Sequence, residues 1–253
     1  KFHRVLGLYR LYGHHVGRYC ICDEKIFKRR LVSIESLFKM KTNIAALRQE
    51  YLLASLNEND LHDNPIVQFK GWFQEALNAF VDEPNAMTLS TVDELHYPKS
   101  RIVLLKGIEE NHFVFYTNYH SSKGKQLTHN PNASLTFLWK ELQRQIRIEG
   151  QVIKTSEEDS VNYFNTRPIE SQLSAWASHQ SELLQNRETL EARFEALKLQ
   201  YQHMPIPKPP HWGGYALIPS YIEFWQGRAS RLHDRICYKK TADTTWIIQR
   251  LNP

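Results

Sequence analysis

Apolar positions recur at helical spacing in the region that follows Asn64-Pro65. This pair is a helix start signal, because asparagine caps free backbone amides and proline suits the first helical position. The next apolar residues are three or four positions apart and predict one apolar stripe: Ile66, Phe69, Phe73, Leu77 and Phe80. A helical pattern also runs from Thr42 to Tyr51. We expect the helix after Pro65 to be structural.

Beyond Pro84 the period of the apolar residues changes to two, which is typical of β-strands. The segments rich in β-branched and aromatic residues are Ala86 to Val92, Ser100 to Ile108, His112 to Asn118, Ala133 to Trp139 and Leu142 to Lys154. Short turn-like stretches separate them. Consecutive short strands with tight connections indicate an antiparallel sheet that closes on itself, because closure removes exposed edges. We therefore expect a small, mainly β barrel.

The second half of the chain returns to helical patterns before three more strands. The capping box Ser156-Glu-Glu-Asp159 predicts a helix to Asn165, and further helices are expected over 168–178 and 187–202. A proline-rich connector follows over 205–210. Strand patterns then cover 215–225, 234–239 and 245–250.

The composition fits a soluble protein with a substantial core. The chain has 253 residues, 42% of them hydrophobic, and no apolar run of eighteen residues that would span a membrane. Its three cysteines, Cys20, Cys22 and Cys237, are too few for a disulfide framework and favour a reducing compartment, so we expect a cytoplasmic protein. No metal site is expected, since Cys20-Ile-Cys22 lacks a second ligand pair.

The formal net charge of +5 is compatible with anionic ligands. Basic residues are interleaved with 27 acidic residues along the chain, which favours small phosphorylated ligands over nucleic acid. Residues 1–39 differ from the rest because they are rich in Arg, His and Tyr and poor in acids. They resemble either a transit peptide or translated upstream sequence with Met40 as the true start, and we favour the second.

Two regions carry candidate anion-binding cations near strand ends. Arg101 and Lys106 flank an apolar strand, on opposite faces if the strand is continuous, and either bind different phosphates or form a solvated edge. Ser121-Ser122-Lys123-Gly-Lys125 begins an expected helix, whose free amides suit a phosphate, although an ordinary capped helix also explains it.

Three further sets of polar residues recur with regular spacing. Gln143, Gln145 and Arg147 share one strand face, which either lines a ligand site or is solvated. Tyr163, Arg167 and Ser171 either align as phosphate donors, if the helix continues past the bend at Pro168, or are surface groups. Arg231, His233 and Arg235 alternate toward one side after Phe224-Trp225, which fits either a site for an anionic planar ligand or a cationic surface strand. Together these groups outnumber the needs of one phosphate. Two phosphorylated ligands would account for them.

Several of these segments closely resemble one known family. They are Arg101-Ile-Val-Leu-Leu-Lys106, Phe115-Tyr-Thr-Asn118, Tyr163-Phe-Asn-Thr-Arg-Pro168, Gln172 to Ser181, Ile222-Glu-Phe-Trp-Gln-Gly227 and Arg231-Leu-His-Asp-Arg235. In this order they resemble the pyridoxamine 5′-phosphate oxidase family over about 46–253. The Arg-Leu-His-Asp-Arg segment is the most specific of them.

The resemblance implies a split β-barrel, antiparallel and Greek-key-like with flanking helices, that forms a homodimer with FMN at the subunit interface. It divides the chain into an N-terminal extension (1–39), an arm (40–65), the FMN-binding split barrel with helices (66–204) and a C-terminal region for dimerisation and substrate binding (205–253). The arm would cover the substrate.

The resemblance also implies the ligand contacts. For FMN these are Arg101, Ile102, Val103, Leu104, Leu105, Lys106, Tyr116, Thr117, Ser122, Lys123, Gln145, Gln180, Ser181, Trp225 and Arg235. For the substrate they are Arg48, Gln49, Glu50, Tyr51, Lys106, Tyr163, Arg167, Ser171, Arg231, Leu232 and His233. Arg231 would position the pyridine ring and His233 would orient or polarise the substrate.

The chain departs from the family pattern at three of its positions. Ser122 and Gln49 stand where many relatives have arginine, and Glu83 stands where aspartate is common. Ser122 would remove one cation from the FMN phosphate. We expect these departures to affect affinity more than the type of reaction.

By this resemblance, the chain oxidises pyridoxamine 5′-phosphate and pyridoxine 5′-phosphate to pyridoxal 5′-phosphate for vitamin B6 salvage or biosynthesis. FMN and dioxygen would serve as oxidants, with release of hydrogen peroxide and, from the amine, ammonia. One alternative is a related split-barrel flavin oxidase for another aromatic substrate, such as a phenazine precursor. The other alternative is a non-catalytic protein, either a carrier of flavin or pyridoxal phosphate or a basic nucleic-acid binder.

Overall fold

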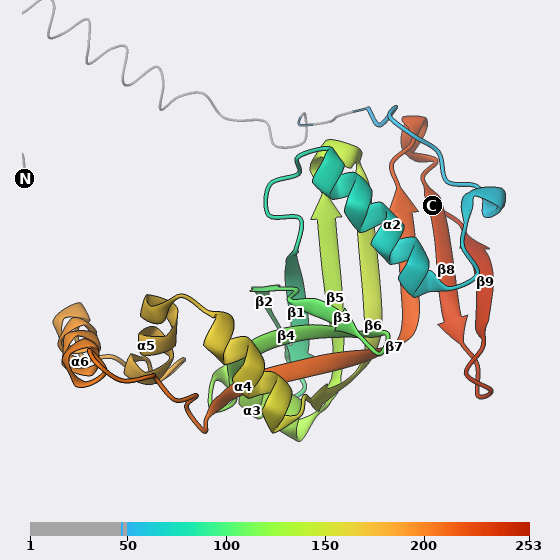
Figure 1. The fold of residues 1–253 in the computed structure, drawn as a ribbon. Helices are drawn as coiled ribbons and strands as arrows, with labels where there is room; N and C mark the ends of the chain where they lie inside the picture. The colour runs from blue at the N-terminus through green and yellow to red at the C-terminus, as the bar shows by residue number, and fades with distance from the viewer. Residues whose placement is uncertain (1–46, 48–49) are drawn as a thin grey trace, which may run out of the picture. The chain divides into compact units, whose positions relative to one another are not determined.

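A nine-stranded antiparallel sheet forms the centre of the protein in a computed structural model that describes residue 47 and residues 50–253 (Figure 1). The strands are β1 (Ala86–Val92), β2 (Pro98–Leu104), β3 (Gly107–Glu109), β4 (His112–Asn118), β5 (Asn132–Trp139), β6 (Arg144–Lys154), β7 (Trp212–Gln226), β8 (Asp234–Lys240) and β9 (Trp246–Leu251). Their spatial order is β2-β1-β5-β6-β7-β4-β3, with β8 added to β7 and β9 added to β8. The expected antiparallel architecture is confirmed.

The long strand β7 makes the sheet curl. Its first half pairs with β4 and its second half with β8, while β6 follows it along almost its whole length. The register between β6 and β7 shifts after Glu149, at Gly150, where a Cβ atom would lie 2.0 Å from the carbonyl oxygen of Ile218. Only glycine allows this close approach, and such a bulge bends a strand pair. The result is a half-barrel rather than a flat sheet.

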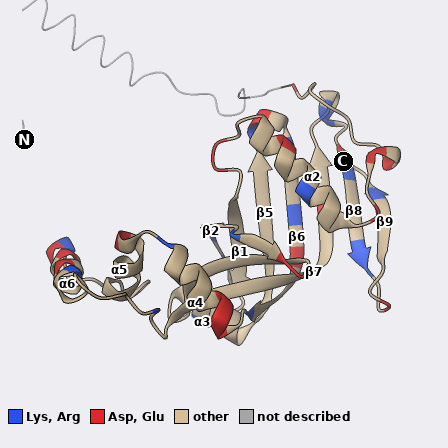
Figure 2. Cartoon of the chain, in the orientation of Figure 1, with Lys and Arg blue, Asp and Glu red and all other residues tan. Residues whose placement is uncertain are grey.

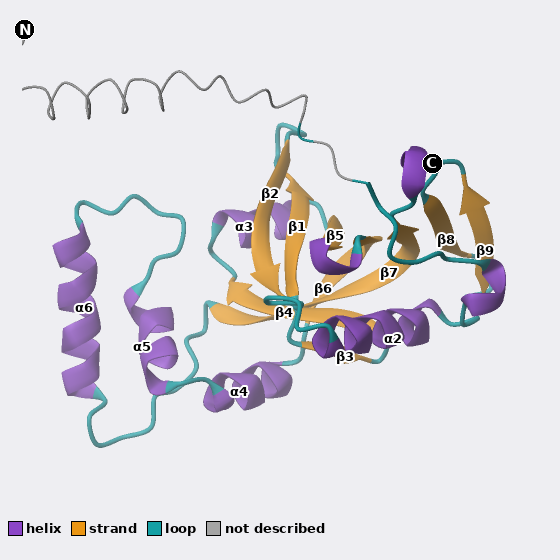
Figure 3. Ribbon diagram, turned by 90° about the horizontal axis from the view of Figure 1, so that it is seen from above, coloured by secondary structure: helices purple, strands orange, loops and turns teal. Residues whose placement is uncertain are grey.

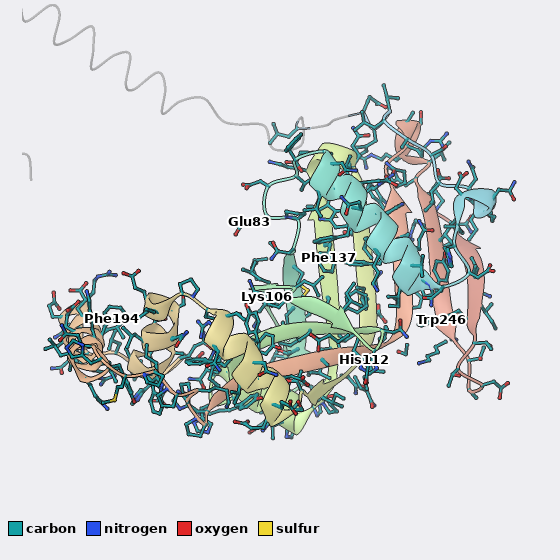
Figure 4. The ribbon with its side chains drawn as sticks, viewed as in Figure 1. Glu83, Lys106, His112, Phe137, Phe194 and Trp246 are labelled. Carbon is teal, nitrogen blue, oxygen red and sulfur yellow. The ribbon has the colours of Figure 1, made fainter. Side chains whose placement is uncertain are left out.

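The register defines an inner and an outer face of the curved sheet. Leu89, Leu135, Ile148 and Ile222 are paired across neighbouring strands and are completely buried on the inner face. Adjacent residues in each strand point the other way, to the outer face. The inner face packs against the helix α2 (Pro65–Asn78), and Phe137, labelled in Figure 4, contacts Phe69 of this helix at a ring distance of 5.2 Å.

Helix α2 starts as predicted, because Asn64 accepts a hydrogen bond from the amide of Ile66 at 2.8 Å. The predicted stripe is wrong at its C-terminal end. Trp72 and Ala76 are buried instead of Leu77, which is 45% exposed, and Phe80, which is 92% exposed. The helix ends at Asn78, and Phe80 has a left-handed backbone with φ of 53°. The stripe was therefore extended past the true helix end.

Two expected strands have different bounds in the structure. The segment from Ser100 to Ile108 is divided into β2 and β3 by a connection at Leu105 and Lys106. The segment from Leu142 to Lys154 begins with a short 3-10 helix (Lys140–Leu142), and Gln143 adopts a left-handed conformation with φ of 55°. Strand β6 therefore begins only at Arg144, and Gln143 does not share its face.

Three helices lie beyond the sheet, in the order α4 (Glu157–Thr166), α5 (Ile169–Ala177) and α6 (Arg187–Gln200), as Figure 3 shows. Their existence agrees with the sequence patterns. The acidic first turn of α4, red in Figure 2, suits the positive end of the helix dipole. Phe164 of α4, Leu173 of α5 and Trp212 of β7 form a second, smaller hydrophobic core. A shorter helix, α3 (Ser122–His129), follows β4.

Several sequence predictions fall outside the described residues, namely those on residues 1–39, on Cys20 and Cys22, and on Arg48 and Gln49. Of the helical pattern from Thr42 to Tyr51, only Leu47, Glu50 and Tyr51 are described, and none of these is helical. The domain bounds at 40, 66 and 205 stay predictions. Among the described helices, none is both long and apolar enough to cross a membrane.

Candidate functional site

The guanidinium of Arg101 is held in place by a set of fixed acceptors. Its Nη1 donates to the hydroxyl of Thr91 at 2.6 Å and to the carbonyl oxygens of Leu89 and Lys99. Its Nη2 donates to Oε1 of Gln126, on helix α3, at 2.8 Å. Burial lowers the pKa of Arg101. Thr91 and Gln126 were not identified from the sequence, although Gln126 lies one helical turn after Lys123.

Lys123 lies close to Arg101, at the start of α3. Its Nζ donates to the hydroxyl of Thr117 at 3.1 Å and to Oε1 of Gln180 at 3.0 Å, so three predicted FMN contacts meet here. Burial and the nearby charge of Arg101 lower the pKa of Lys123 to about 8. Neither cation is paired with a carboxylate in the part of the chain that the structure describes. Two adjacent cations without a counter-charge fit an anion such as a phosphate.

The low pKa of Lys123 predicts pH-dependent binding of a phosphorylated ligand. A phosphate favours the charged amine, so affinity should fall as pH rises through about 8 and Lys123 of the free protein loses its proton. We expect FMN to bind about tenfold more weakly at pH 9.5 than at pH 7, since a hydrogen bond to a charged group contributes about 1.5–3 kcal/mol. Quenching of FMN fluorescence measures this. Lys123→Met should flatten the pH profile, and an unchanged profile would contradict the assignment.

A second cation site surrounds Arg167. Its guanidinium carbon lies 4.6 Å from the ring centre of Trp212, and Tyr163 stacks on Tyr116 at 3.9 Å, nearly parallel to Trp212. Burial lowers the pKa of Arg167, and its Nη1 is buried with no hydrogen-bond partner in the described part of the chain. A buried unpaired donor is unfavourable, and a ligand that accepts a hydrogen bond, such as an anion, would fit this arrangement. Trp212 was not identified from the sequence.

Tyr163, Arg167 and Ser171 do not lie on one helix. Helix α4 ends at Thr166, Arg167 is extended with ψ of 148°, and α5 begins at Ile169. Pro168 therefore breaks the helix, because its ring is incompatible with continuing the preceding turn. Tyr163 and Arg167 still meet, since both pack on Trp212. Ser171 is half-buried in the first turn of α5.

An aromatic cluster forms a third part of the site. The imidazole of His233 lies 4.6 Å from Trp225, and Tyr51 contacts both rings, at 5.8 Å from Trp225 and 5.6 Å from His233. The amide of Arg228 donates to Nδ1 of His233 at 3.1 Å. The proton of the neutral ring is therefore on Nε2. Burial and the charge of Arg231 lower the pKa of His233, which keeps the ring neutral at pH 7.

The strand alternation predicted for Arg231, His233 and Arg235 is wrong. Strand β8 begins only at Asp234, and Arg231 ends a 3-10 helix (Ala229–Arg231) with φ of 60°. Arg231 and Leu232 are exposed. Only Arg235 is on the strand, where it pairs with Trp225 across β7 and β8.

Arg235 belongs to a charged network on the outer face of the sheet. Its Nε and Nη2 donate to the carboxylate of Glu223 at 2.8 and 3.2 Å, and Arg147 and Tyr221 also donate to Glu223. Glu223 is only 2% exposed. Gln145 and Trp225 are register partners on the same face, so the expected shared face of Gln145 and Arg147 is confirmed. Glu223 was not identified as a site residue from the sequence. A glutamate within a largely apolar strand is the signal that could have identified it.

The remaining residues predicted to contact FMN or the substrate lie mostly at the surface or along strand β2. Lys106 is exposed beside a groove of about 670 Å³ between α2 and the β2–β3 connection, and Figure 4 labels it together with Glu83. Ser122, Ser181 and Glu50 are exposed, and Ser181 has a left-handed backbone with φ of 74°. Ile102, Val103, Leu104 and Leu105 belong to β2 or follow it directly.

The parts of the site lie on opposite faces of one sheet. Arg101 is the register partner of the buried Leu89 and therefore points to the inner face. Gln145, Trp225 and Arg235 are neighbours on the outer face. One chain therefore does not bring these two groups around the same ligand.

Comparison with known proteins identifies the family that these features belong to. Residues 73–201 match the sequence model described as pyridoxamine 5′-phosphate oxidase, and residues 212–253 match the pyridoxine 5′-phosphate oxidase C-terminal dimerisation region. The pyridoxine/pyridoxamine 5′-phosphate oxidase of Burkholderia thailandensis is 55% identical over 214 residues, which are 84% of this chain and 100% of that protein. The enzyme of that name from Acaryochloris marina is 52% identical over 84% of this chain and 97% of its own. The chain belongs to the pyridoxamine 5′-phosphate oxidase family.

Solved structures support the fold of this oxidase family. PhzG from Burkholderia lata 383, in complex with tetrahydrophenazine-1-carboxylic acid, has a TM-score of 0.76 and 32% identity, and the match covers 80% of this chain and 99% of PhzG. A pyridoxamine 5′-phosphate oxidase-related, FMN-binding protein from Nostoc punctiforme has a TM-score of 0.62 at 19% identity, over 73% of this chain and 97% of that protein. The resemblance to the family and the split-barrel fold are thus confirmed.

Proposed function

We propose that this protein is an FMN-dependent oxidase that converts pyridoxamine 5′-phosphate and pyridoxine 5′-phosphate to pyridoxal 5′-phosphate. Dioxygen would be the electron acceptor, giving hydrogen peroxide, and the amine substrate would also release ammonia. The observation that carries the proposal is the presence of two separate cationic groups that fit phosphates, one at Arg101 and Lys123 and the other at Arg167. A phosphorylated cofactor and a phosphorylated substrate require two such sites. The 55% identity to a named oxidase over 84% of this chain supports the same conclusion.

The first anion site fits the phosphate of FMN. Arg101 and Lys123 supply the charge, while Thr117 and Gln180 hold the amine in place. Ser122 is exposed and adds no cation, so two cations rather than three would bind this phosphate. The indole of Trp225 and the guanidinium of Arg235 offer a planar surface for the ring system. Bound FMN would supply the two-electron oxidation of the substrate carbon that bears the amine or alcohol.

The second anion site fits the phosphate of the substrate. The Nη1 of Arg167 and the hydroxyl of Tyr163 are donors, and Ser171 lies in the first turn of the next helix. Lys106 would approach the same phosphate. Anchoring the phosphate at a fixed point orients the rest of the molecule, which lowers the entropic part of the barrier.

His233 and Arg231 would act on the pyridine ring of the substrate. With Nδ1 occupied by the amide of Arg228, the Nε2 proton of His233 is available to donate to a ring substituent. Its lowered pKa keeps it a neutral donor at pH 7. Arg231 is exposed and carries the positive charge that would stabilise negative charge developing on the ring. Tyr51, which belongs to the arm, would cover the site beside His233 and exclude water from it.

Two copies of the chain would build each site. Arg101 and Lys123 come from the inner-face side of one copy, and Trp225, Arg231 and His233 would come from the other copy. The match of residues 212–253 to a dimerisation region supports this arrangement. A two-fold homodimer then contains two equivalent sites.

The proposal is tested by the spectrum and the turnover of the purified protein. We expect a yellow protein with bound FMN that, under air, forms pyridoxal 5′-phosphate and hydrogen peroxide in equal amounts from pyridoxamine 5′-phosphate. Pyridoxamine without phosphate is the matched control and should react at least about 100-fold less efficiently, because Arg167 is left unpaired. Flavin binding with no oxidation of either vitamer would contradict the proposed substrate. Equal rates with and without phosphate would contradict the second anion site.

A second candidate substrate class follows from the similarity to PhzG, whose solved structure contains a reduced phenazine carboxylic acid. The carboxylate of such a tricyclic compound would pair with Arg167, and its rings would stack on the aromatic cluster. Oxidation of a reduced phenazine carboxylate faster than of pyridoxamine 5′-phosphate would favour this function. The identity of 55% to pyridoxine/pyridoxamine 5′-phosphate oxidases, against 32% to PhzG, supports the phosphorylated vitamers.

A further inference from the structure

The segment from Tyr51 to Glu58 crosses the end of strands β7 to β9 with almost no regular structure of its own. Leu56 is its buried apolar residue, at 3% exposure, whereas Leu52 and Leu53 are 74% and 62% exposed. A segment with so few apolar contacts is held mainly by polar interactions and opens easily.

Both backbone groups of Leu56 are bound by side chains from the C-terminal strands. Its amide donates to Oδ2 of Asp234 at 3.0 Å, and its carbonyl oxygen accepts from Nη2 of Arg250 at 2.9 Å. Arg250 also donates to Oδ1 of Asp234 at 2.8 Å and to both carboxylate oxygens of Glu58, at 2.7 and 2.9 Å. We call Glu58, Asp234 and Arg250 the arm clasp. A guanidinium that binds two carboxylates and a carbonyl has a well-defined orientation.

The chain leads from the clasp back to Tyr51 through one further polar contact. Between the clasp and Tyr51, the amide of Leu53 donates to Oε1 of Gln143 at 3.3 Å. Tyr51 then lies with its ring edge against Trp225 and His233. Its approach requires glycine at position 227, where a Cβ atom would be 2.8 Å from Cγ of Tyr51. The segment thus ends on the two rings to which we assign flavin and substrate contacts.

Asp234 connects the clasp directly to the site. It is the residue after His233, its side chain is 14% exposed, and Arg228 donates to its Oδ2 at 2.9 Å. The amide of the same Arg228 donates to His233. Asp234 therefore binds the arm through Leu56 and, through Arg228, the loop that holds the imidazole.

We propose that Arg250 and Asp234 are positioning residues that, through this clasp, hold residues 51–58 of the arm over the substrate. This inference rests on the proposed function, because Tyr51 covers the vitamer only if the vitamer binds at Trp225 and His233. Glu58, Asp234 and Arg250 are not among the residues to which we assign contacts with FMN or the substrate. Its loss should therefore lower the population of the closed arm and weaken substrate binding, while the flavin stays bound.

The test is Arg250→Met, which keeps the length of the side chain and removes every donor. In the FMN-loaded protein we expect KM for pyridoxamine 5′-phosphate to rise about tenfold, as it would if the arm were closed one tenth of the time. The Kd for FMN should stay the same. Adding Tyr51→Ala to Arg250→Met should cause little further change, whereas independent roles would give multiplied effects. Multiplied effects, or an unchanged KM, would overturn the proposal.

Two further variants guard against a general folding defect. Glu58→Gln affects a carboxylate whose side chain is 59% exposed, so it should fold normally and shift KM in the same direction by a smaller factor. Arg187→Met removes a comparable surface ion pair, to Glu191 on α6, and should change nothing. An equal KM increase in Arg187→Met would overturn the proposal.

Hydrogen exchange separates this inference from the proposed function. In the FMN-loaded protein, Arg250→Met should speed exchange of the amides of residues 51–58 and leave those of β6 unchanged. This readout needs no substrate. Fast exchange in a protein that does not oxidise pyridoxamine 5′-phosphate would refute the substrate and keep the clasp. Unchanged exchange over 51–58 would refute the clasp even in an active oxidase.

Discussion

Replacing Arg167 with methionine is expected to raise KM for pyridoxamine 5′-phosphate about 100-fold, since each hydrogen bond to a charged group contributes about 1.5–3 kcal/mol. The buried Nη1 of Arg167 has no partner among the residues that the structure describes, so its hydrogen bonds are available to the phosphate. Flavin content should not change, because Arg101 and Lys123 hold the other phosphate. Steady-state kinetics and the visible spectrum measure the two effects separately.

The same substitution should not destabilise the protein. Arg167 is held between Trp212 and Phe164, where methionine also packs well. The substitution removes a partly buried charge whose burial already lowers its pKa. We expect Tm to change by no more than about 3 °C, which corresponds to roughly 1 kcal/mol for a chain of this size. Loss of activity without loss of stability is the signature of a binding residue.

Arg187→Met is the matched control for this experiment as well. Arg187 is 83% exposed in its ion pair with Glu191, so neither KM nor Tm should move. A KM for Arg167→Met within twofold of the unmodified protein would show that the phosphate binds elsewhere. A collapse of Tm would instead show that Arg167 supports the second hydrophobic core.

The fold was largely predictable from the periodicity of apolar residues, and the errors in this prediction have local causes. Alternation identified all long strands because each has one face in the core, as at Leu89 and Ile148. The ends of elements were less predictable. Phe80 has the spacing of a helical stripe, but backbone hydrogen bonding stops at Asn78 and sends the chain into a left-handed turn. Gln143 has the spacing of a strand residue, but its backbone is left-handed. Sequence spacing carries no information on the local φ angle, so this end of the strand was also predicted wrongly.

Site residues were predictable where a motif lies within one helix or strand. They were less predictable where residues distant in the sequence contact one another. Arg101, Lys123 and Gln180 were expected from the family resemblance, and the structure brings Lys123 and Gln180 together although 57 residues separate them. Their assigned roles remain proposals. Trp212 and Glu223 were missed because their importance comes from contacts with distant residues, Arg167 and Arg235 respectively. The contact between Glu223 and Arg235 follows from the pairing of β7 with β8, which spacing within one segment does not encode.

Two inactive variants are expected to restore activity when they share a dimer. Arg101→Met removes a cation from the FMN phosphate site, and Arg231→Leu removes the exposed charge assigned to the substrate ring while the flavin stays bound. Each homodimer should then retain only a small fraction of normal turnover. If each site combines Arg101 of one copy with Arg231 of the other, a mixed dimer contains one intact site and one site with both defects.

Random pairing makes half of the dimers mixed, so co-expression of the two variants should restore about one quarter of normal activity, and the isolated mixed dimer about one half. Purification through two different tags on the co-expressed chains provides that mixed dimer. The double variant Arg101→Met with Arg231→Leu, paired with an unmodified chain, is the matched control: both substitutions lie on one copy, so each of its two sites carries one defect. This control should be nearly inactive although it contains the same substitutions in the same number. The contrast follows from the register of the sheet, which points Arg101 to the inner face and Trp225, just before the Arg231 loop, to the outer face. If each chain instead built a complete site alone, the result would reverse: the control would keep half of the activity and the mixed dimer would stay inactive.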